Sequence, residues 1–224
     1  MIFILNILWF VLGGFTALAT ASNEMQIEET EIHEVTQAAQ AATKVFFPRA
    51  ENRKAVFGFD ANDRLEAAVL KSPVKLYTID DAAMLAYQPG QPVSQLLKST
   101  GQWFVPVAIG GTNRAMIAVI ATGDGKWTGS TFGLAPLARK WQNIESWWPS
   151  AEKFTPRLII LPVAQGYFFT IPQTEPGNLT AMVDLPATHI DSTAVPKPPL
   201  AAAESKLTGI RDALKQAKNE PDHQ

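Results

Sequence analysis

Residues 103–132 read WFVPVAIGGTNRAMIAVIATGDGKWTGSTF, and this stretch predicts three consecutive antiparallel strands. Its first part, Trp103 to Ile109, carries the aromatic and β-branched residues that suit a pleated, partly buried surface. Turn residues follow at 110–113, and Asp124-Gly125 supplies a second tight turn. The run between the turns, 115–121, is apolar throughout, which is typical of a strand covered on both faces. We therefore expect this second strand to lie between the first and the third.

Two features of this stretch need interpretation. Pro106 cannot donate a ladder hydrogen bond, so it places the first strand at an edge of the sheet or at a bulge. The glycines at 110, 111, 123, 125 and 129 also suggest a phosphate-binding loop. Neither GxxxxGK[ST] nor a GxGxxG that opens a helix after a strand is present, so we interpret them as turn residues.

Hydrophobic periodicity predicts the elements around this meander. Strands are expected at 55–59, 74–79, 157–163 and 167–171; helices at 28–47, 61–70, 134–148 and 200–218; and shorter helical segments after Asp80 and at 93–97. Pro48 should end the first helix, Asp60 should cap the second, and Pro162 and Pro172 should place the last hairpin towards an edge. The fold class is α+β: an antiparallel sheet of about five or six strands packed against one main helix, 134–148, with peripheral N- and C-terminal helices.

Five segments divide the chain. They are an N-terminal apolar segment (1–21), a helical segment (22–54), the α+β core domain (55–185), a Pro-rich linker (186–199), and a C-terminal amphipathic helix with its tail (200–224). The C-terminal helix carries a narrow apolar stripe. It docks on the domain, pairs with another chain, or stays partly disordered.

The N-terminal segment predicts export. Residues 1–21 are almost entirely apolar and close with Ala19-Thr20-Ala21, the A-x-A pattern of a secretory signal peptide. The alternative is an uncleaved anchor, because about 20 apolar residues can span a bilayer. We favour cleavage, which makes the protein periplasmic or secreted. An anchor would hold the domain outside the cytoplasm and would be its only contact with a membrane.

Composition narrows the class of protein. At 224 residues with 46% hydrophobic content, the chain is long enough for one sizeable globular domain. A formal net charge of -2 and the absence of a basic run argue against a nucleic-acid partner. There is no cysteine, so stability has to come from a packed core without disulfides.

Trp147 is the one residue that the sequence singles out as a candidate binding residue. It lies about 140° from the middle of the apolar stripe on the 134–148 helix, if each residue turns by about 100°. An exposed tryptophan can stack on a sugar ring or anchor a protein partner. The alternative, which we favour, is that Trp147 packs beneath the C-terminal segment, because large aromatic side chains are mostly buried.

Signatures of catalysis and of metal binding are missing. The chain has only three histidines (His33, His189 and His223) and no cysteine, which argues against the common zinc sites, and no cofactor motif is present. The serine of 129–133 does not fit the GxSxG pattern. We assign no catalytic residue and no metal ligand. Carboxylate chemistry stays open because its acids meet in space; the candidates are Glu66, Asp80, Asp81, Asp124, Glu145 and Asp184.

Three functional hypotheses follow. The first is an exported, non-enzymatic binding or structural module that holds an unidentified protein or envelope component of a bacterial-type cell. The second is a carboxylate-dependent hydrolase that acts on an envelope glycan or peptide, for which two carboxylates in one cleft would be evidence. The third is a small-molecule carrier, for which an aromatic-lined cavity between helix and sheet would be evidence.

Overall fold

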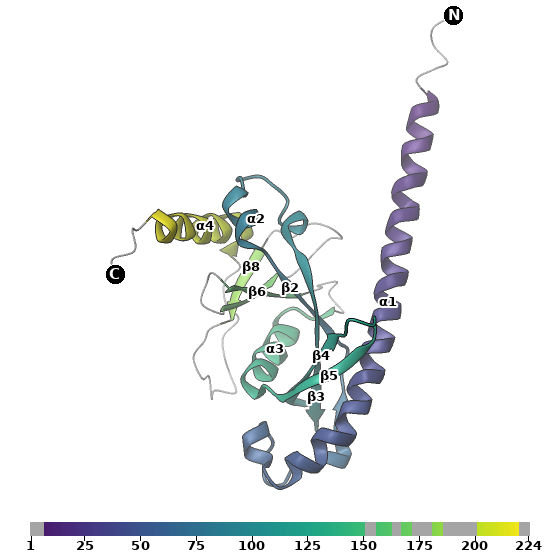
Figure 1. Cartoon of the computed structure of the whole chain (residues 1–224), viewed down its shortest axis with the longest axis vertical. Helices are drawn as coiled ribbons and strands as arrows, with labels where there is room; N and C mark the ends of the chain where they lie inside the picture. Colours follow the sequence, from purple (N-terminus) through teal and green to yellow (C-terminus); the bar gives the residue numbers. More distant parts are fainter. Residues whose placement is uncertain (1–6, 151–155, 163–166, 172–180, 186–200, 220–224) are drawn as a thin grey trace, which may run out of the picture.

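A computed structural model describes residues 7–150, 156–162, 167–171, 181–185 and 201–219. Its helices are α1 (Ile7–Glu51), α2 (Asp81–Ala86), α3 (Ala135–Trp147) and α4 (Ala203–Asn219), with 3-10 turns η1 (Lys54–Phe57), η2 (Leu65–Ala67) and η3 (Val93–Leu96). The strands are β1 (Val69–Leu70), β2 (Val74–Thr78), β3 (Lys98–Ile109), β4 (Thr112–Ala121), β5 (Trp127–Gly133), β6 (Arg157–Leu161), β7 (Tyr167–Ile171), β8 (Ala181–Leu185) and β9 (Ala201–Ala202). Figure 1 shows α1 running along one side and α4 at the other.

The sheet is mixed and mostly antiparallel, which confirms the α+β class. Its order is β5-β4-β3-β2-β6-β7-β8-β9, with β1 also paired to β3. Every pairing is antiparallel except β2 with β6, where Leu76 lies opposite Leu158 in a parallel ladder. This parallel pair joins the N-terminal meander to the C-terminal strands, which is why one sheet spans the domain.

The meander is confirmed, and β4 lies between β3 and β5. Of the two positions expected for Pro106, the edge is wrong, because β3 pairs with β4 on one side and with β1 and β2 on the other. The register of β3 against β4 shifts one residue further on, between Val107 and Ala108. The Lys71 amide donates to the Pro106 carbonyl over 2.9 Å. A strand residue points its N and C=O to the same side, so the missing donor of Pro106 faces the break between β1 and β2. No ladder bond is lost there.

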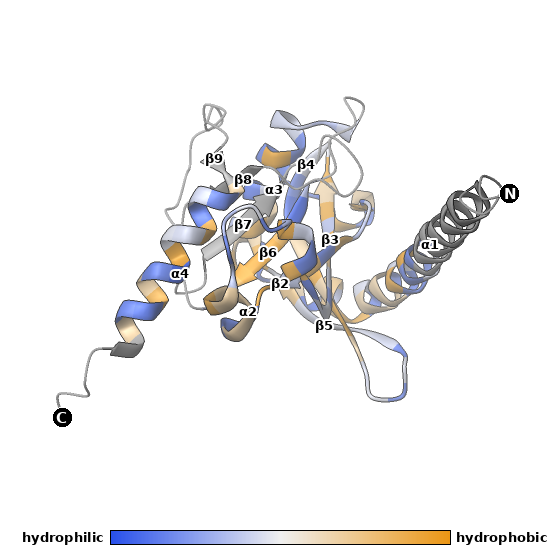
Figure 2. Cartoon of the chain, turned by 90° about the horizontal axis from the view of Figure 1, so that it is seen from above, coloured by the Kyte–Doolittle hydropathy of each residue, from blue (hydrophilic) through white to orange (hydrophobic). Residues whose placement is uncertain are grey.

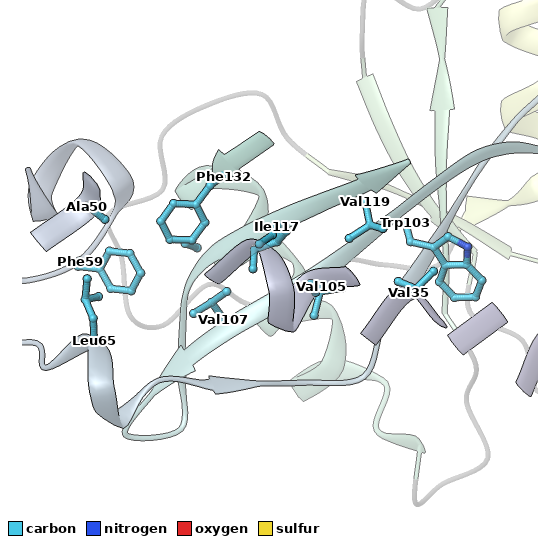
Figure 3. Close-up of a cluster of buried hydrophobic side chains, with 13 residues drawn as sticks. Val35, Ala50, Phe59, Leu65, Trp103, Val105, Val107, Ile117, Val119 and Phe132 are labelled. Atoms are coloured by element: carbon cyan, nitrogen blue, oxygen red, sulfur yellow. The ribbon is translucent and has the colours of Figure 1, made fainter. Parts of the chain in front are cut away.

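Helix α1 covers one face of the meander. Its Val35 and Ala39 are fully buried and join a cluster with inward residues of β3, β4 and β5, including Ile117 and Phe132 (Figure 3). Helix α1 continues three residues beyond Pro48, so the predicted end at 47 is wrong. The last turn carries Ala50, which is fully buried in the same cluster, and this packing offsets the one backbone bond that the proline removes. The predicted boundary between 54 and 55 thus separates segments that share one cluster.

Helix α3 covers the opposite face, as the apolar stripe on 134–148 predicts. Leu137, Ala138, Trp141 and Ile144 pack with residues of β2, β3, β4 and β6. The helix begins at Ala135, one residue later than expected, and its packed stripe begins at Leu137, because Leu134 is 38% exposed and adopts a left-handed φ of 52° before the helix. The main helix of the prediction is therefore confirmed.

Helix α4 docks on the domain, which is one of the three alternatives left open for the C-terminal helix. Ala203 and Leu207 are buried in a third cluster with α2, η3 and β6, and Ile210 and Leu214 pack against it. The Arg211 guanidinium donates to the Tyr87 carbonyl over 3.0 Å. Figure 2 shows the alternating polar and apolar bands along α4 that this docking requires.

The segment 55–70 differs from its prediction. The expected strand at 55–59 is the 3-10 turn η1, and the expected helix at 61–70 is a loop that leads through η2 to β1. Asp60 caps no helix; its amide donates instead to the Asp63 carboxylate over 2.8 Å. Arg114 of β4 binds both carboxylates, with Nη2 2.7 Å from Asp60 and Nε 3.0 Å from Asp63. These distant ion pairs hold the loop conformation.

The predicted hairpin of β6 and β7 forms, but its expected edge position is wrong. Strand β6 lies between β2 and β7, and β7 pairs with β8. Pro162 follows the last residue of β6, so no ladder bond is missing.

A helix with the length and apolar character needed to cross a membrane is not found among the residues that the structure describes. Several features named in the sequence analysis lie outside the described part of the chain. They are the residues before α1, Pro172, the side chain of Asp184, the linker 186–199, His189 and His223.

Candidate functional site

Two adjoining chambers that share lining residues form a valley in which aromatic and charged side chains lie together. The larger chamber, about 470 Å³, lies beside α3, and the smaller, about 270 Å³, lies beside α1. Four residues line both chambers: Pro73, Val74, Trp141 and Pro156. The valley exists because the parallel ladder with β6 begins only at Leu76, so the first residues of β2 stand beside an opening.

The wall of the larger chamber is held by one carboxylate. Glu145 Oε2 accepts from Lys71 Nζ over 3.1 Å and from Asn113 Nδ2 over 3.3 Å, while Oε1 accepts from Trp141 Nε1 over 3.1 Å. Asn113 is fully buried, and its backbone N–H donates to Gln142 Oε1 over 2.7 Å. Three donors therefore fix the Glu145 carboxylate, and through it the Trp141 indole that both chambers share.

The floor of the smaller chamber carries two cations over aromatic rings. Lys75 lies 5.1 Å from the Trp103 ring centre and pairs with Glu31 of α1 at 2.5 Å. The Arg157 guanidinium lies 5.2 Å from the centre of the Tyr77 ring. Burial raises the pKa of Tyr77, while the Arg157 charge lowers it, and the net shift is upward. The Tyr77 hydroxyl thus keeps its proton at neutral pH and can donate.

Trp147 lies behind the larger chamber and does not line it. It is half-buried and packs against the α3 cluster, with its ring edge-on to Trp148 at 5.7 Å and 82°. Trp148, which does line the chamber, is 1% exposed. The proposed role of Trp147 in binding stays a prediction. Trp147 contacts the lining of the larger chamber through Trp148.

The acids named as candidates for carboxylate chemistry are dispersed. Asp80 caps α2 by accepting from the Ala83 amide over 2.7 Å, and it pairs with Lys98. The Lys98 hydrogen bond holds the pKa of Asp80 below its usual value. Hydrogen bonds from Lys126 and Thr122 lower the pKa of Asp124 in the same way. These shifts are opposite to the raised pKa of a general acid.

The remaining candidates have local contacts. Glu66 and Asp81 are exposed, and Glu66 lines a shallow pocket of about 220 Å³ beside Phe47 and Pro48. His33 is exposed on α1 and lies 2.9 Å from the Gln37 amide nitrogen. Within the described residues, no group of three or more His, Cys, Asp and Glu side chains could hold a metal ion.

Comparison with protein families, curated proteins and solved structures finds no match. The function therefore has to be argued from the valley itself.

Sequence reasoning missed the valley because its lining comes from five separate parts of the chain. Glu28 and Ile32 are on α1, Val74, Lys75 and Tyr77 on β2, Trp103 on β3, Trp141 on α3, and Arg157 on β6. Each of these residues follows the periodicity of its own element. No signal within a single element marks these residues as neighbours.

Proposed function

We propose that this protein is a non-enzymatic binding module whose ligand occupies the valley between α1, β2 and α3. The observation that carries this proposal is the aromatic-lined space between helix and sheet, with Trp141 as the wall common to both chambers. Ligand pockets typically enclose about 300–1,000 Å³ and combine apolar walls with a few placed polar groups. The larger chamber falls within that range, and its polar groups are held by Glu145.

The contacts of the carboxylates support binding over hydrolysis. Glu145 already accepts three hydrogen bonds, so both of its oxygens are engaged by the protein itself and hold the chamber wall. Glu28 and Glu31, the acids nearest the smaller chamber, lie on α1; Glu28 is exposed, and Glu31 is paired with Lys75. A hydrolase would need two carboxylates that share a cleft with different proton affinities.

Export is the second part of the proposal, and the sequence supports it through residues 1–21. We propose that the domain acts in the periplasm or outside the cell, released by cleavage near Ala21 or held by an uncleaved segment. Cell fractionation followed by N-terminal sequencing of the mature protein tests this part. An N-terminus at Ser22 supports cleavage, and recovery of the protein from the cytoplasm contradicts export.

A ligand screen tests the binding function. The chain from Ser22 onward is followed by tryptophan fluorescence and thermal midpoint against muropeptides, oligosaccharides, short peptides, lipids and divalent metals. Ser72→Trp places a large ring at an exposed position that lines the larger chamber, and Ser205→Trp adds the same ring to an exposed position on α4. A response that is lost in Ser72→Trp and kept in Ser205→Trp supports the valley.

Trp147→Ala is measured in the same screen. A response that survives Ser72→Trp but disappears in Trp147→Ala would move the binding site to the end of α3. If no ligand class produces a response, the small-ligand function is contradicted, and a protein partner should be sought by crosslinking in the native compartment.

A further inference from the structure

Arg157 differs from the other cations that line the valley. Lys71 pairs with Glu145 and Lys75 pairs with Glu31, both within 3.1 Å. Within the described residues, Arg157 has no carboxylate within ion-pair distance and is held by the face of Tyr77. A cation–π contact supplies no acceptor oxygen, so the guanidinium N–H groups can still donate to a planar acceptor such as a carboxylate.

The other lining residues define what such an acceptor would be attached to. Ile32, Pro73, Val74, Trp103 and Trp141 give the smaller chamber an apolar surface around the guanidinium. Its volume of about 270 Å³ suits the end of a ligand, and the larger chamber continues beyond Pro73 and Val74. A multiply charged anion such as a phosphate would be attracted by Arg157 alone and repelled by Glu28 and Glu31, so its net electrostatic energy in the chamber would be unfavourable.

We propose that the smaller chamber binds a single carboxylate on an apolar body, with the carboxylate at Arg157 and the apolar body against Trp103, Trp141 and Val74. This inference rests on the proposed function and names the class of its ligand. A fatty acid and the C-terminus of an apolar peptide both present this chemistry. The protonated Tyr77 hydroxyl adds a second donor beside the guanidinium.

Four probes distinguish the contribution of the carboxylate to binding from that of the apolar body. Octanoate and N-acetyl-Leu-Leu carry the acid, and octanamide and N-acetyl-Leu-Leu-amide are their neutral counterparts. Each is titrated into the chain from Ser22 onward and followed by tryptophan fluorescence and calorimetry. We expect each acid that binds to do so at least tenfold more tightly than its amide, because charge-assisted hydrogen bonds are about twice as strong as neutral ones. Preference for octanoate or for the peptide identifies the source.

Two variants test the position of the charge. Arg157→Gln should abolish the preference for the acid while leaving the amide unchanged. Because Gln cannot stack as Arg does, its thermal midpoint has to be measured first. Glu28→Lys leaves Arg157 untouched: Glu28 is exposed and lines the chamber, so the reversed charge should tighten acid binding severalfold. Glu29→Lys makes the same change in net charge at the adjacent exposed position, which does not line the chamber, and should have a smaller effect.

The outcomes separate the two proposals. If the amides bind as tightly as the acids, or if Glu28→Lys and Glu29→Lys act equally, the carboxylate inference is overturned and the valley remains a binding site. If neither acid binds, the inference is also overturned, and the wider ligand screen decides the proposed function.

Discussion

Gly129 on β5 sets how closely α1 approaches the sheet. A Cβ at this position would lie 2.4 Å from the Cβ of Ala42, and side-chain atoms of Phe46 and Ile117 lie within 3.7 Å of the same point. Ordinary contact begins near 3.4 Å, so in Gly129→Ala the helix would have to retreat by about 1 Å. Overpacking of this kind costs about 1–3 kcal/mol. We expect a loss of about 2 kcal/mol in the free energy of unfolding.

Urea unfolding of the chain from Ser22, followed by circular dichroism and tryptophan fluorescence, measures this loss. Gly123→Ala is the matched control: nothing lies within 4 Å of its added Cβ, and its stability should change by less than about 0.5 kcal/mol. Ala42→Gly alone should cost about 1 kcal/mol through helix propensity. Combined with Gly129→Ala, it removes the clash. The double variant should therefore lose less free energy of unfolding than the two single variants lose in sum, by at least about 1 kcal/mol. Strictly additive costs would refute the close contact of α1 with β5.

Three further variants test other contacts by the same unfolding assay. Glu145→Leu leaves the donors of Trp141 and Asn113 without their acceptor and should lower the free energy of unfolding by about 2–4 kcal/mol. Glu145→Gln keeps one acceptor oxygen and should cost clearly less. Equal costs for the two variants would contradict the hydrogen-bond network. Leu207→Ala empties a fully buried site between α4 and the sheet and should cost about 2–4 kcal/mol, and a cost below about 1 kcal/mol would mean that α4 is not docked. The buried Tyr87 hydroxyl has no hydrogen-bond partner within the described structure, so Tyr87→Phe should keep or slightly raise stability at pH 7. Burial raises the pKa of Tyr87, so the wild type should lose stability as the pH rises beyond about 10, and Tyr87→Phe should lose less; equal losses would refute this assignment.

The elements predicted correctly are those whose signals are local. The meander follows from strand-forming residues separated by turn glycines, and Gly110, Gly111 and Gly125 all adopt positive φ in the structure. The apolar stripe of α3 and the short helix after Asp80 are likewise properties of short segments. Each of these signals acts within one or two turns of the chain.

The errors arise where distant residues decide. The loop at 60–63 is held by Arg114, more than 50 residues away, and no local pattern contains that information. The end of α1 is set by burial of Ala50 against the sheet, which outweighs the effect of Pro48. The candidate site belongs to the same class, because its residues meet only after β2 and β6 have paired in parallel. Trp147 does not line the valley, and its role in binding stays a prediction.

The parallel pair also determines the order in which the domain can be assembled. The Thr78 hydroxyl donates to the Ile160 carbonyl over 3.0 Å, across 82 positions of the chain. Closing so long a loop is entropically costly until the intervening meander and α3 have folded and shortened it. We therefore expect the β2–β6 ladder to form late, and β6 to β8 join the rest of the sheet only through it. During synthesis, the C-terminal strands would be the last to join the sheet, so we expect this half of the chain to be the part most exposed to misassembly.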